Sequence, residues 1–156
     1  MKSENTGVVN SMIKNDGQTI LVVDDVEETL DGIKEMLTRD GYRVEAARDE
    51  RKAAEKARLN SPDLMLVSLD GEVGDVVVAA KRIRSLAGLN DDLPIIIFCV
   101  GEIKEGSETA VGDNIYLAHP DNFNQLRDLI ASLLLRFPSG ARIQNNPNSI
   151  KKISTL

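Results

Sequence analysis

The chain has 156 residues, of which 42% are apolar and 3% aromatic, a size that predicts one globular domain with an ordinary core. A net charge of −6 argues against nucleic-acid binding, and a single cysteine excludes an internal disulfide and fits a reducing compartment. No apolar run reaches the roughly 18 residues that span a bilayer, and residues 1–5 lead into no apolar signal core, so we expect a cytoplasmic protein without membrane contact.

Strand and helix alternate from the start of the chain. Residues 1–18 are rich in small polar side chains and are predicted to form a flexible N-terminal arm. A strand over residues 19–23 precedes a helix that should stop at Gly41. A second strand is predicted over residues 42–46, followed by an alanine-rich helix over residues 49–59. The expected inward positions of the two helices are Leu30, Ile33 and Leu37, then Ala53, Ala54 and Ala57.

The strands predicted at residues 64–69 and 95–100 are continuously apolar, as strands covered by helices on both faces must be. A helix over residues 76–86 lies between them, and a short fifth strand is predicted over residues 114–118. The last helix is strongly amphipathic. Its predicted inward residues are Phe123, Leu126, Leu129, Ile130, Leu133, Leu134 and Phe137.

The segment from residue 101 to residue 111 stands where a fourth helix belongs. It contains two glycines and few apolar anchors, so we expect a short or frayed helix there. Five strands alternating with five helices predict a doubly wound five-stranded parallel sheet flanked by helices. In such a sheet the functional cleft lies at the carboxyl ends of the strands, near the switch in strand order.

Polar side chains end several of these strands. Asp24 and Asp25 follow the first strand, and two carboxylates in this position define a cleft that can hold a cation. The third strand ends on a hydroxyl, that of Ser68, where the cleft would be expected to supply another carboxylate. Cys99 lies at the end of the fourth predicted strand, and His119 follows the fifth.

These landmarks together resemble the receiver domain of two-component response regulators. The resemblance covers about residues 19–137 and implies a flavodoxin-like fold with strand order 2-1-3-4-5. We therefore divide the chain into a receiver-like domain at 19–138 and a flexible C-terminal tail or linker at 139–156. The motifs that carry the resemblance are Leu21-Val22-Val23-Asp24-Asp25, Pro62-Asp63-Leu64, Pro94-Ile95-Ile96-Ile97 and Gly112-Asp113-Asn114-Ile115-Tyr116-Leu117-Ala118-His119-Pro120.

In that family an acidic pair and a strand-end aspartate hold magnesium, and the aspartate takes a phosphoryl group from a histidine kinase. The resemblance places Asp24 and Asp25 at the acidic pair and the main-chain carbonyl of Asp70 at a metal ligand. Ser68 stands at the phosphoacceptor position. Magnesium should therefore bind weakly at Asp25 and Asp70, if it binds, because one of two direct carboxylate ligands is missing.

The switch residues also differ from the family pattern. Cys99 stands where the family has Thr or Ser, and His119 stands where it has Lys. Tyr116 matches the aromatic residue that changes rotamer in active receivers. The net charge of the pocket nevertheless stays at about −2, which favours a site that lost phosphoryl chemistry as a unit.

Alternative interpretations exist for each of these residues. Cys99 is either a small buried hydrophobic residue, which we favour, or a redox switch. His119 is either a strand-end cap, which we favour, or a pH sensor. Ser68 is a poor phosphoserine site because it ends a buried strand. For the Asp24-Asp25 pair, a remnant in a polar cleft and a residual cation site are equally compatible with the sequence, and Tyr116 fits a static partner surface.

The sequence thus predicts a degenerate pseudo-receiver that has no catalytic residue, requires no cofactor and acts by phosphorylation-independent contact with a protein partner. A histidine kinase or an output protein fits that role, and a homodimer is left open. The alternative is a regulated receiver that responds to another ligand, a cation or pH. An enzyme is the third interpretation and the least favoured, because no Gly-rich or Ser/Thr-rich phosphate loop follows the first strand.

Overall fold

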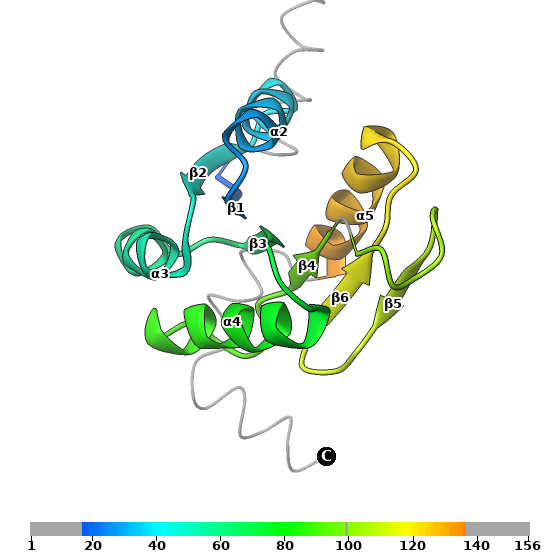
Figure 1. The fold of residues 1–156 in the computed structure, drawn as a ribbon. Coiled ribbons are helices and arrows are strands. Elements are labelled where there is room, and N and C mark those ends of the chain that lie inside the picture. Colours follow the sequence, from blue (N-terminus) through cyan, green and yellow to red (C-terminus); the bar gives the residue numbers. More distant parts are fainter. Residues whose placement is uncertain (1–16, 99, 137–156) are drawn as a thin grey trace, which may run out of the picture.

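A computed structural model describes residues 17–98 and 100–136 of the chain. Within them, a six-stranded sheet is flanked by four helices (Figure 1). The strands are β1 (Thr19–Asp24), β2 (Arg43–Ala47), β3 (Leu64–Ser68), β4 (Ile95–Ile97), β5 (Glu108–Ala110) and β6 (Ile115–Ala118). The helices are α2 (Glu27–Arg39), α3 (Glu50–Leu59), α4 (Val73–Leu86) and α5 (Phe123–Arg136).

The strand order is β2-β1-β3-β4-β6-β5. All neighbouring pairs are parallel except β5 and β6, which are antiparallel. The five parallel strands confirm the predicted doubly wound sheet with order 2-1-3-4-5, and β5 is an additional edge strand. The strand order reverses between β1 and β3, so the predicted cleft lies at the carboxyl ends of these two strands.

The helices form a layer on each face of the sheet (Figure 1). Along β1, Ile20 and Val22 pack in one cluster with residues of α2 and α5. Leu21 and Val23 pack in the other cluster with residues of α3 and α4. All four side chains are fully buried, because successive residues of a strand point to opposite faces and both faces are covered.

The helices begin and end close to the predicted positions. Asp49 caps α3 by accepting a 2.8 Å hydrogen bond from the main-chain nitrogen of Lys52, and the three predicted alanines are buried. In α5 the residues Leu126, Ile130, Leu133 and Leu134 are buried as predicted. Phe123 is 55% exposed, so its predicted inward position was wrong: it is the first residue of the helix and lies off the buried face.

The prediction of a short or frayed helix at residues 101–111 was also wrong. A turn runs from Lys104 to Ser107, with Gly106 at a φ of 85°, and β5 follows directly. Positive φ suits glycine at this position of a turn, and the β-branched Thr109 and Val111 favour extended backbone over helix. The same lack of apolar anchors that argued against a stable helix is compatible with a strand that is exposed along its whole length.

Two other predictions concern parts of the chain that lie mostly or wholly outside the described residues. These are the N-terminal arm, of which only residues 17 and 18 are described, and the C-terminal tail, together with Phe137. Within the described ranges, no helix combines the length and the apolar character that a membrane span requires.

Candidate functional site

The acidic pair lies at the carboxyl end of β1. Asp24 is 1% exposed, and its Oδ1 accepts a 2.9 Å hydrogen bond from the main-chain nitrogen of Val26. Its Oδ2 is buried and has no hydrogen-bond partner among the described residues. Burial raises the pKa of Asp24 above its ordinary value, and the negative charge of Asp25 raises it further. The carboxyl group therefore holds a proton more tightly than an exposed aspartate does.

Asp25 is half-buried and connects two loops. Its Oδ2 accepts a 2.9 Å hydrogen bond from the main-chain nitrogen of Asp70, which follows β3. Its main-chain oxygen lies 3.4 Å from Nη2 of Arg48, which follows β2. Arg48 also lies 3.5 Å from Glu27, but both side chains are exposed and such a pair contributes little stability. Asp25 thus holds the loop after β3 against the end of β1.

Ser68 lies directly across from Asp24, because the two residues are partners in the parallel β1–β3 register. Ser68 is half-buried and Asp70 is exposed. The structure therefore brings together Asp24, Asp25, Ser68 and Asp70, as the sequence predicts for strand ends on either side of the switch point. Over the described ranges, no group of three or more His, Cys, Asp or Glu side chains is placed to hold a metal ion.

His119 is connected to the turn before β5. Its Nδ1 lies 3.0 Å from the main-chain oxygen of Ile103, and its main-chain nitrogen donates to the oxygen of Ser107 at 3.1 Å. Its own main-chain oxygen accepts from the nitrogen of Gly106 at 2.6 Å. In the part of the chain that is described, none of these bonds reaches the acidic pair. Cys99 lies outside the described residues.

Tyr116 lies on β6 and is half-buried. It is opposite Ala110 in the β5–β6 register, and it lines a groove of about 540 Å³ between these strands and one side of α5. Glu108 and Asp128 contribute carboxylates to this groove, and Arg136 contributes a guanidinium. The groove is therefore an open surface of mixed apolar and charged character.

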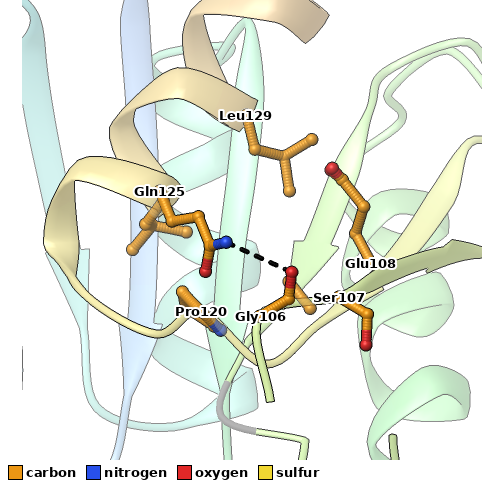
Figure 2. A pocket seen from close by; sticks show the side chains of 8 residues that line it. Gly106, Ser107, Glu108, Pro120, Gln125 and Leu129 are labelled. Carbon is orange, nitrogen blue, oxygen red and sulfur yellow. Dashed lines mark hydrogen bonds between the residues drawn. The ribbon is translucent and has the colours of Figure 1, made fainter. Parts of the chain in front are cut away.

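Sequence reasoning missed Gln125, which fastens the turn before β5 to α5. Its Nε2 donates a 3.1 Å hydrogen bond to the main-chain oxygen of Gly106, as Figure 2 shows. Its Oε1 accepts from the main-chain nitrogen of Asp121. The cavity beneath this contact has a volume of about 40 Å³, which is room for little more than a water molecule. The cavity is therefore a packing feature rather than a ligand site.

Sequence reasoning also missed Arg84, which is 4% exposed. Its Nη1 donates to the main-chain oxygens of Leu93 at 3.0 Å and Asp113 at 2.8 Å. Lys81 binds the Asp113 carboxylate at 3.0 Å, so α4 holds the turn that leads into β6. The signal was present in the sequence, because Arg84 follows the buried Ala80 by four residues and so lies on the buried face of α4.

Comparisons with known proteins agree with this geometry. The profile of the response regulator receiver domain matches residues 20–131. The response regulator MprA of Mycobacterium tuberculosis is 31% identical over 126 residues, which cover 75% of this chain and 50% of that protein. MprA of Mycolicibacterium vanbaalenii is 30% identical over 121 residues, with the same coverage. The chain thus spans about half the length of the curated relatives it matches.

Solved structures show the same fold. The response regulator TrrA from Thermotoga maritima, solved in complex with Mg²⁺-BeF, superposes with a TM-score of 0.58 at 23% identity and covers 75% of this chain and 99% of that one. The chemotaxis protein CheY4 from Vibrio cholerae superposes with a TM-score of 0.56 at 23% identity, covering 75% and 98%. The strand order, the acidic pair at the switch point and the match over residues 20–131 show that the chain belongs to the response regulator receiver domain family of two-component signalling.

Proposed function

We propose that this receiver domain works as a phosphorylation-independent protein–protein interaction module. One observation carries the proposal: β3 ends on the hydroxyl of Ser68, directly across from Asp24. The resemblance of the sequence to the receiver family assigns this position to the phosphoacceptor aspartate. A carboxylate forms an acyl phosphate, whereas a serine hydroxyl does not. The domain is accordingly a signalling module without catalytic residues.

We further propose that the domain requires no cofactor and binds magnesium weakly. Two observations support this. Among the described residues, no group of three or more His, Cys, Asp or Glu side chains is placed to hold a metal ion, and of the three aspartates at the cleft Asp70 is exposed. One oxygen of Asp25 already accepts the main-chain nitrogen of Asp70. Magnesium, which prefers a full set of oxygen ligands, would have to keep most of its waters there.

Receiver domains in two-component systems interact with histidine kinases or with output domains. We propose a protein partner of this kind, in the cytoplasm, for the present chain. The groove beside Tyr116 supports the proposal, because it joins an aromatic side chain with both signs of charge on rigid elements. Its shape is set by the contacts of Gln125 and His119 with the turn before β5, none of which involves the acidic cleft.

A second candidate function follows from Asp24. Its buried Oδ2 has no hydrogen-bond partner in the described part of the chain. A bound cation or a proton would supply the missing interaction. A receiver that responds to occupancy of this site is therefore the alternative. It differs from the main proposal in requiring that the cleft control the partner surface.

Magnesium titration of the unaltered chain and two variants separates the two candidates. We expect Ser68→Asp to bind magnesium at least about tenfold more tightly than the unaltered chain, because it restores a carboxylate opposite Asp24. Ser68→Ala is the matched control and should bind as weakly as the unaltered chain. Calorimetry gives the affinities, and amide NMR spectra recorded with magnesium and beryllofluoride report the partner surface.

The unaltered chain should show no shifts at Tyr116 under these conditions. If the unaltered chain binds magnesium as tightly as Ser68→Asp and its Tyr116 amide signal shifts, occupancy of the cleft controls the partner surface. The second candidate function then replaces the first.

A further inference from the structure

The two edges of the sheet carry opposite charge. The strand order places β5 and β2 at opposite ends of the sheet, as Figure 1 shows. Three exposed carboxylates lie on β5 and in the segment 101–107 before it, beside the exposed Lys104, and none of the three forms an ion pair within the described residues. We call this surface the acidic ridge; its residues are Glu102, Glu105 and Glu108.

Within the described residues, the main chain of β5 also has no strand partner on the side away from β6. The nitrogen of His119 donates to the oxygen of Ser107, and the nitrogen of Val111 donates to the oxygen of Ile115. Bonded residues alternate along an antiparallel pair, so Thr109 also faces β6. The main-chain groups of Glu108 and Ala110 therefore point away from the sheet and are free to pair with another strand.

The opposite edge is a groove between α2 and α3, with β2 at its base. The groove has a volume of about 730 Å³ and includes Ala46 and Ala47 of β2. Three lysines line it and form no ion pair within the described residues. We call it the basic groove after these residues, Lys34, Lys52 and Lys56.

The carboxylates of Asp25, Asp31 and Asp49 also line the basic groove and reduce its net positive charge. Asp49 caps α3 and Asp25 accepts the main-chain nitrogen of Asp70, whereas Asp31 forms no such hydrogen bond within the described residues. The guanidinium of Arg48 adds to the positive charge of the groove. The groove therefore keeps a small net positive charge that attracts an acidic segment, and among the described strands β2 is hydrogen-bonded to β1 alone.

We propose that the acidic ridge of one copy of this chain docks in the basic groove of a second copy, with β5 placed along β2. Each edge supplies what the other lacks: unpaired charge of the opposite sign and an unpaired strand edge. Ridge-to-ridge pairing would set three glutamates against three glutamates. Because ridge and groove are different surfaces, each docked pair leaves one ridge and one groove free, and assembly continues head to tail unless it closes into a ring.

Sedimentation velocity of the full chain over about a hundredfold range of concentration tests the proposal. The weight-average mass should pass that of a dimer, and raising the salt from about 50 to 300 mM should weaken association several-fold. Glu108→Lys should weaken association at least about fivefold. The matched control is Asp91→Lys, in the loop before the central strand β4, which changes the net charge from −6 to −4 in the same way.

A mixing experiment fixes the head-to-tail arrangement. One variant carries Glu105→Gln and Glu108→Gln, and the other carries Lys52→Gln and Lys56→Gln. Each alone should stay monomeric, and together they should form a complex that stops at one copy of each, because only one ridge and one groove remain intact. A chain that is monomeric throughout, an assembly that stops at a dimer without closing a ring, or equal effects of Glu108→Lys and Asp91→Lys would overturn the proposal.

Discussion

At the scale of single residues, the cleft retains an acid whose burial is costly. Asp24 is fully enclosed, one of its oxygens has no hydrogen-bond partner among the described residues, and Asp25 adds a like charge. An ionised carboxylate in this position lowers the free energy of unfolding. Its raised pKa means that the folded protein binds the proton more tightly than the unfolded chain does.

We expect Asp24→Asn to raise the free energy of unfolding at pH 7 by about 1–3 kcal/mol. The amide oxygen can still accept from the nitrogen of Val26, and the buried charge is removed. In the unaltered protein, Asp24 contributes most to the free energy of unfolding when the pH is below its ordinary pKa of 3.8. This contribution is lost as the pH rises through its raised pKa. Denaturant unfolding at several pH values should therefore show the gain shrinking toward acid pH. A loss of stability at pH 7 would contradict this account.

At the scale of elements, the sequence predicted best where periodicity was strong. Continuous apolar runs identified the buried strands, and apolar spacing identified α2 and α5. The hairpin of β5 and β6 was not predicted, because a three-residue exposed strand has no apolar alternation. For the site, register placed Ser68 across from Asp24 as expected from strand ends. Helical spacing from Ala80 places Arg84 on the buried face of α4, but its partner carbonyls and the contact of Gln125 with Gly106 depend on tertiary packing, which the sequence pattern does not show.

Amide hydrogen exchange should alternate along the additional edge strand. Thr109 and Val111 direct their nitrogens toward β6 and should exchange more slowly than Glu108 and Ala110, whose nitrogens point outward. Measurement by NMR at low protein concentration avoids protection by a second copy. Uniformly fast exchange over residues 101–111, or protection as strong as that of α5, would show that the segment does not form this strand.

The buried guanidinium of Arg84 should stabilise the fold more than an exposed guanidinium does. We expect Arg84→Met to lower the free energy of unfolding by about 2–3 kcal/mol, because the carbonyls of Leu93 and Asp113 lose a charged donor while the side-chain volume stays similar. Arg82→Met is the matched control, since Arg82 forms an exposed ion pair with Glu50 and its loss should lower the free energy of unfolding far less. Equal losses in chemical denaturation would refute a structural role for Arg84.

At the scale of the whole molecule, the acidic cleft and the groove beside Tyr116 are separate surfaces. The cleft is built from the ends of β1 and β3, whereas the groove is built from β5, β6 and α5. The resemblance of the sequence to the receiver family predicts that Cys99 and His119 stand at the positions that bind the phosphoryl group in that family. In this chain His119 bonds instead to the turn before β5. We therefore expect the partner surface to remain in one state.

Partner binding should consequently depend on the groove and hardly on the cleft. Tyr116→Ala should weaken binding by about 1 kcal/mol or more, as expected for an aromatic at the centre of an interface. Ser68→Ala should change it by less than about 0.5 kcal/mol. Calorimetry with a partner captured by the isolated domain gives both values. Loss of binding in Ser68→Ala with no effect of Tyr116→Ala would assign control to the cleft.

The central claim is that this receiver does not accept a phosphoryl group, and intact-mass measurement tests it most directly. The purified chain is incubated with a small-molecule phosphoryl donor and magnesium, beside a receiver that has the family's aspartate as a positive control. We predict an unchanged mass for this chain, because the hydroxyl of Ser68 stands where an acyl phosphate would need a carboxylate. A gain of one phosphate on any residue of the cleft, accompanied by amide shifts at Tyr116, would contradict the claim.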